Sequence, residues 1–150
     1  MALSPSILIP VAVVFAVGVG FAIQAPLNAS LGKQIESGVA AAAISFGVGF
    51  AALLILTLAL GDGAAFGRSV GVPLLYWGGG LLGAAVVWSM LWAVPVIGIL
   101  TAMAALLFGQ LGAALVLDAL GAFGAPVTPV TWRRVAALAL VAGGLVLSRL

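Results

Sequence analysis

The chain of 150 residues predicts an all-α membrane protein with five transmembrane helices. Its composition is 65% hydrophobic and only 5% charged, whereas a soluble domain carries about 25% charged residues to cover its surface. Apolar stretches of about 20 residues, the length that crosses a bilayer as a helix, recur along the chain. The breaks between these stretches hold glycine, proline and the few charged residues. These observations exclude a soluble protein.

The five expected spans form a single transmembrane domain, residues 1–150, and cover about residues 7–31, 39–60, 74–93, 96–120 and 131–147. The loop at 61–73 contains Arg68 and four glycines, so it is expected to lie in water. The apolar block at 74–121 would be about 72 Å long as one helix, more than twice the hydrocarbon thickness. It must therefore turn once. We expect the turn at 93–95, because proline lacks an amide donor and disfavours helix at the preceding residue.

Positive charges are divided almost evenly between the two sides of the membrane. With five spans the termini lie on opposite sides, and Arg68, Arg133 and Arg134 oppose Lys33 and Arg149. A difference of three against two is too small to fix one orientation by the positive-inside rule. We therefore expect insertion in both orientations and an antiparallel homodimer. The alternative is one fixed orientation, with the three-charge side cytoplasmic.

Neutral polar side chains within the spans are the candidates for solute binding. Gln24 and Asn28 are four residues apart, so they share one face of the first helix. Pro26 between them predicts a kink, and broken helices recur at transporter binding sites. The alternative is ordinary hydrogen bonding between helices, worth about 0.6 kcal/mol on average. The predicted solute-binding residues are Gln24, Asn28, Ser45, Trp88 and Gln110.

Charged groups within the spans are few. Asp118 near the end of the fourth expected span is a functional candidate, because intramembrane carboxylates usually are. The simpler expectation is a structural charge pair between Asp118 and Arg133 or Arg134. The chain has no cysteine or histidine and only three carboxylates. Because no acid–base or metal constellation can be assembled from these residues, we expect neither an enzyme nor a cofactor.

Four short stretches resemble the YdcZ-like family of the drug/metabolite transporter superfamily: residues 20–24 with Asn28, 45–47, 78–83, and 109–111 with 117–118. The resemblance implies a five-helix subunit that pairs antiparallel, with itself or with a paralogue, and a transport role. Gln24, Asn28, Gln110 and Asp118 resemble the family's polar positions. The small multidrug exporters of the superfamily use a carboxylate in the first helix. This chain has none there, so their proton-coupled cation export is not expected.

The resulting expectation is a small-solute transporter of the bacterial inner membrane, working as an antiparallel dimer by alternating access. The solute is expected to be neutral or weakly polar. The expected partners are a second copy of the chain, membrane lipid and the solute, with no nucleic acid. The alternatives are a non-transporting membrane subunit, or half of a heterodimer with an oppositely oriented paralogue.

Overall fold

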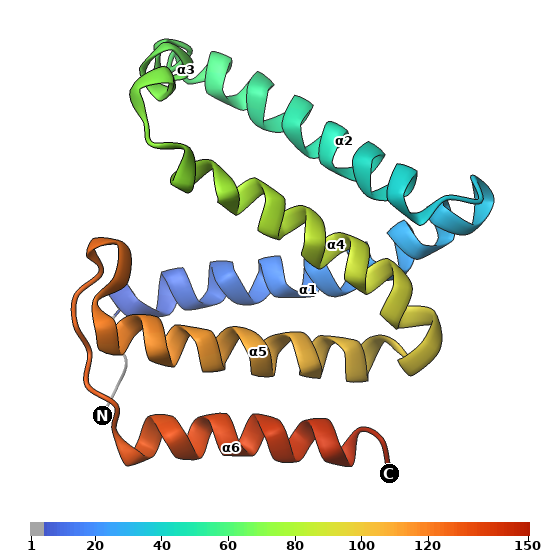
Figure 1. Cartoon of the computed structure of the whole chain (residues 1–150), viewed down its shortest axis with the longest axis vertical. Helices are drawn as coiled ribbons and strands as arrows, with labels where there is room; N and C mark the ends of the chain where they lie inside the picture. Colours follow the sequence, from blue (N-terminus) through green and yellow to red (C-terminus); the bar gives the residue numbers. More distant parts are fainter. Residues whose placement is uncertain (1–4) are drawn as a thin grey trace. The chain divides into compact units, whose positions relative to one another are not determined.

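A computed structural model of the chain describes residues 5–150, with side chains from residue 7 onward, and these residues form an all-α fold (Figure 1). The long helices are α1 (Pro5–Gln34), α2 (Gly38–Ala59), α4 (Gly78–Ile97), α5 (Ile99–Leu120) and α6 (Trp132–Leu147). The short elements are α3 (Ala64–Arg68), η1 (Ser69–Gly71), η2 (Leu74–Trp77) and η3 (Ala122–Gly124).

Among the described residues, four segments are long and apolar enough to cross a membrane: Ile7–Gln34, Gly38–Ala59, Leu74–Ile97 and Ile99–Leu120. They correspond to the first four expected spans. The fifth expected span forms α6, which has 16 residues and is shorter than the other four long helices. Its length is about 24 Å at 1.5 Å per residue, below the hydrocarbon thickness of about 30 Å. A fifth crossing therefore stays a prediction.

Two of the connections between helices differ from the sequence-based expectation. The turn expected at 93–95 lies at Gly98, because α4 continues through Pro95 to Ile97. Pro95 occupies the last turn of the helix, where its missing amide removes one bond from the ladder, and Gly98 adopts a φ of +80° that suits glycine. The loop at 61–73 also contains α3, whose Arg68 pairs with Asp62 at 3.3 Å.

The chain divides into two compact units, the first up to Val96 and the second from Ile97 to Leu150. In the first unit, a tight turn joins α1 to α2. The Ser37 amide donates to the Gly32 carbonyl at 3.0 Å, and the Ser37 hydroxyl caps α2 by accepting from the Ala40 amide at 3.2 Å. Glu36 holds the left-handed position of this turn with a φ of +55°, where glycine is usual.

Small residues bring the helices of the first unit together. Buried Ala41 and Ala42 of α2 pack with Val87 and Leu91 of α4, and Ala29 and Leu31 of α1 border this cluster. A Cβ placed on Gly32 would lie 3.4 Å from both the Gly38 Cα and the Leu91 Cδ2. Such close approach lets membrane helices gain dispersion contacts, because lipid gives little hydrophobic drive for helix association.

In the second unit, α5 and α6 lie side by side and antiparallel (Figure 1). Polar contacts join the two helices at both ends. At the start of α5 the buried Thr101 hydroxyl accepts from the Ser148 hydroxyl at 3.2 Å and donates to the Ser148 carbonyl at 3.3 Å. At the other end Arg134 of α6 forms a salt bridge with Asp118 of α5. Contacts at both ends fix the register of the hairpin.

The end of α5 depends on Gly121. This residue has a φ of +59°, and an added Cβ would lie 2.6 Å from the Val127 Cγ2. We therefore expect Gly121→Ala to destabilise the protein by roughly 1–3 kcal/mol, through backbone strain and a clash. Thermal unfolding in detergent measures this loss.

Gly124→Ala is the matched control, because Gly124 has a φ of +81° but open space around its Cβ position. Its cost should contain the backbone strain alone. Equal losses in the two variants would show that Val127 yields and that the clash contributes nothing.

Candidate functional site

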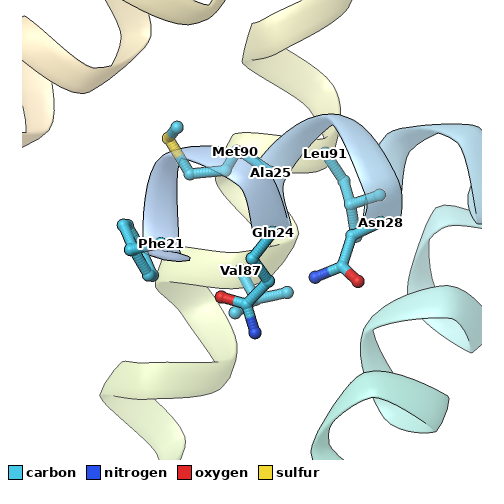
Figure 2. Close-up of a pocket in the computed structure, with 7 residues that line it drawn as sticks. All are labelled: Phe21, Gln24, Ala25, Asn28, Val87, Met90 and Leu91. Atoms are coloured by element: carbon cyan, nitrogen blue, oxygen red, sulfur yellow. The ribbon is translucent and has the colours of Figure 1, made fainter. Parts of the chain in front are cut away.

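The paired amides of α1 face a narrow crevice against α4. Gln24 and Asn28 lie on the same side of α1, so the four-residue spacing acts as expected (Figure 2). Figure 1 shows the C-terminal part of α1 turned away from the line of its N-terminal part, the direction change that a proline within a helix favours. The crevice holds about 10 Å³, room for about one water molecule. Its lining residues are Phe21, Gln24, Ala25, Asn28, Val87, Met90 and Leu91.

A wider groove lies between α1 and α2. Its volume is about 360 Å³, within the range of about 300–1,000 Å³ typical of small-molecule sites. Gln24 reaches it from α1 and Ser45 from α2, and the remaining wall is Phe46, Gly49, Phe50 and Leu53. Gln24 thus belongs to both hollows. The site has two polar side chains on an apolar wall, which suits a small solute with one or two hydrogen-bonding groups.

The amides of α1 have unused hydrogen-bonding capacity. Within residues 7–150, the side chains of Gln24, Asn28 and Ser45 are half-buried, and none of the side-chain hydrogen bonds includes them. An amide side chain carries two donors and an acceptor. Because an unsatisfied polar group in hydrocarbon is costly, these groups favour a partner of complementary polarity.

Trp88 and Gln110 lie elsewhere. Trp88 of α4 is about half exposed at 54% and borders the α2–α4 side of the first unit, away from the Gln24 groove. Gln110 lies on α5 in the second unit, is exposed there, and lines none of the hollows described within either unit. The structure therefore joins three of the five predicted solute-binding residues, Gln24, Asn28 and Ser45, through the two hollows that share Gln24.

Of the two arginines considered for Asp118, the structure places Arg134 against it. The guanidinium of Arg133 instead lies over the ring of Trp132, 5.9 Å from its centroid. Both side chains of the Asp118–Arg134 pair are about one third exposed. The pair joins the end of α5 to the start of α6.

Sequence reasoning missed two groups of residues. Phe21, Met90 and Leu91 complete the amide crevice. The only feature of the sequence that could have indicated them is that they lie within one helical turn of Gln24 or Trp88. A further hollow of about 390 Å³ is bordered by Lys33 and Glu36 of the α1–α2 turn and by the Trp88–Trp92 face of α4. Over the described range, no group of three acidic, histidine or cysteine side chains could hold a metal ion.

A family model described as "Putative inner membrane exporter, YdcZ" matches residues 9–147. Searches of curated proteins and of solved structures give no match. The matched range contains every residue of the α1–α2 groove and of the amide crevice. Together with four helices apolar enough to cross a membrane, this match shows that the chain is an integral membrane protein of the inner membrane and belongs to the YdcZ family of the drug/metabolite transporter superfamily.

Proposed function

We propose that the protein transports a small neutral or weakly polar solute across the inner membrane. The observation that carries this proposal is the 360 Å³ groove, in which Gln24 and Ser45 are the only two polar side chains of the wall. Neither side chain has a hydrogen-bond partner among the residues described, so both are available to a solute. The family description, that of an exporter, agrees with a transport role rather than with catalysis.

The solute class follows from the chemistry of the groove. No charged side chain lines it, and burying an unpaired ion in an apolar site is far more costly than burying a neutral polar group. A neutral solute with an amide or hydroxyl group could exchange hydrogen bonds with Gln24 and Ser45. Asn28 is one helical turn from Gln24 and lines the narrow crevice next to the groove. For Trp88 and Gln110, solute contact stays a prediction.

The proposed working form is an antiparallel homodimer with five spans in each copy. The even division of the positive residues supports it, because the positive-inside rule then gives either orientation little preference. In such a dimer the two copies could exchange inward- and outward-facing states, which gives alternating access.

Purified protein in liposomes tests the transport. We expect uptake of one or more radiolabelled neutral amides or polyols at rates above those of protein-free vesicles. Absence of uptake over this panel, with folded dimer verified by size and cross-linking, would point to a non-transporting subunit or to a missing paralogue. Co-reconstitution with an oppositely oriented paralogue separates those two outcomes.

Single cysteines test the orientation, because the chain has no native cysteine. Ala64 at the start of α3 and Gln34 at the end of α1 are both exposed, and the five-span arrangement places them on opposite sides. We expect an impermeant thiol reagent to label about half of Ala64→Cys and half of Gln34→Cys in intact cells, with the remainder labelled after permeabilisation. Complete labelling of one variant and none of the other would establish a fixed orientation and refute the self-paired antiparallel dimer.

A further inference from the structure

The α2–α4 side of the first unit carries two adjacent hollows. The first, about 390 Å³, lies at the α1–α2 turn and the last turns of α4. The second, about 420 Å³, lies between α2 and α4. Val39 and Trp88 line both of them. The two hollows are therefore adjacent, and we call them together the α2–α4 groove, with a mouth at the helix ends and a trough along the helices.

The mouth carries one charge of each sign. Lys33 borders it from the last turn of α1, Glu36 from the α1–α2 turn, and Trp92 from α4. The ion pairs of the described residues are Asp62–Arg68 and Asp118–Arg134, so neither charge of the mouth is neutralised by one of them. Trp92 is 71% exposed; an indole at a helix end is typical of the membrane–water interface. The mouth is thus complementary to a group that also carries both charges.

The trough is apolar and is long enough for part of a lipid acyl chain. Its wall runs from Val39 to Phe46 on α2 and from Trp88 to Leu81 on the antiparallel α4. Seven residues of helix span about 10 Å, which is about two thirds of one leaflet of the hydrocarbon core. Four alanines between these ends leave the trough open: Ala42, Ala43, Ala84 and Ala85. The charged mouth next to the apolar trough matches the arrangement of a lipid headgroup next to its acyl chain.

We propose that the α2–α4 groove binds a zwitterionic glycerophospholipid. The ammonium of its headgroup pairs with the Glu36 carboxylate, and its phosphate pairs with the Lys33 ammonium. One acyl chain lies in the trough against Phe46 and Trp88. This site lies between α2 and α4, whereas the proposed solute groove lies between α1 and α2. The solute groove shares no residue with the mouth and shares Phe46 with the trough.

The conformation of Glu36 agrees with this role. Its φ of +55° lies in the left-handed region, where glycine or asparagine costs less than glutamate. A turn that served only to connect α1 and α2 would be more stable with one of those residues. Glu36→Asn is therefore a useful variant, because it removes the charge without adding backbone strain.

The test measures the change in melting temperature of purified protein in detergent on titration with short-chain lipids. Dioctanoyl phosphatidylethanolamine should raise the melting temperature, and dioctanoyl phosphatidylglycerol, which has no ammonium, should raise it less. Glu36→Asn and Lys33→Gln should each weaken the apparent affinity for the ethanolamine lipid about fivefold, the contribution of one exposed ion pair. Asp62→Asn, which removes a charge from the exposed loop pair at the start of α3, is the control and should leave the affinity unchanged.

A substitution that fills the trough tests whether binding needs the acyl chain as well as the headgroup. Ala43 is exposed on the wall of the trough, whereas Ala51 is exposed on the same helix outside it. Ala43→Leu should abolish the lipid-induced shift, and Ala51→Leu should preserve it. An equal shift with free phosphoethanolamine would identify a soluble zwitterion and overturn the lipid assignment. Equal shifts with both lipids, or no effect of Ala43→Leu, would also overturn it.

Discussion

Gln24→Leu should lower the initial rate of solute transport about tenfold or more at solute concentrations below saturation. Gln24 lines both the amide crevice and the α1–α2 groove. Its loss leaves Asn28 as the polar side chain of the crevice and Ser45 as the polar side chain of the groove. A solute group that leaves water and finds no partner costs about 1–3 kcal/mol, and 1.4 kcal/mol corresponds to a factor of ten. Uptake by reconstituted vesicles measures the change.

The stability of Gln24→Leu should be close to that of the original protein. Leucine has a similar volume and fits an apolar wall, and the Gln24 side chain makes no hydrogen bond with the described residues that the substitution would break. Gln34→Leu is the matched control, because Gln34 is exposed at the end of α1 and lines none of the described hollows. It makes the same chemical change and should leave transport intact.

A different result would separate the two interpretations of the amides. If Gln24 bonds another helix of the dimer, Gln24→Leu lowers the melting temperature and the fraction of dimer, and transport falls in proportion to the dimer that remains. If Gln24 binds solute, transport falls while melting temperature and dimer fraction do not. A normal rate with normal stability would remove Gln24 from the proposed function. Ser45→Ala should show the same separation with a smaller loss, since one hydroxyl is removed.

Sequence periodicity predicts the long helices well, because a membrane helix needs a long apolar run and the breaks are marked by glycine, proline and charge. It fails at the α4–α5 turn for a local reason. Pro95 is the stronger breaker in principle, but the last turn of α4 tolerates it and the helix is interrupted at Gly98, whose φ is +80°. It also misses α3, which lies among loop glycines and has no apolar period.

The site is predictable only where its residues share one helix. The spacing of Gln24 and Asn28 places both amides on one face, as Figure 2 shows. The meeting of Gln24 with Ser45 depends on how α1 and α2 cross, and the choice of Arg134 over Arg133 depends on the rotation of α6 against α5. Such tertiary contacts leave no trace in the spacing of residues. The α2–α4 groove was missed for the same reason, because its charges and its tryptophans lie about 55 residues apart.

Breaking the Asp118–Arg134 pair from the arginine side should have a large effect on stability. Arg134→Met leaves the Asp118 carboxylate without its partner near the end of a membrane helix. Removal of one partner from a buried pair costs about 3–5 kcal/mol. Since both side chains are about one third exposed, we expect a smaller loss of about 1–3 kcal/mol, within the range for exposed and buried pairs. Thermal unfolding in detergent at neutral pH measures it.

A double-mutant cycle then distinguishes a structural role for Asp118 from a functional one. Asp118→Asn alone leaves the Arg134 guanidinium unpaired, and its Nη1 is already buried without a hydrogen-bond partner. The double variant Asp118→Asn/Arg134→Met contains no charge at either position, so it should be more stable than the sum of the two single losses predicts. If the pair is structural, the double variant also regains transport together with stability. If the carboxylate takes part in transport, stability returns and transport does not.

The Arg133→Met control should change neither stability nor transport appreciably, because Arg133 lies over Trp132 and outside the pair. Additive losses in the cycle would mean that the two charges do not interact in solution, and the clamp between α5 and α6 would then rest on the Thr101–Ser148 contacts at its other end.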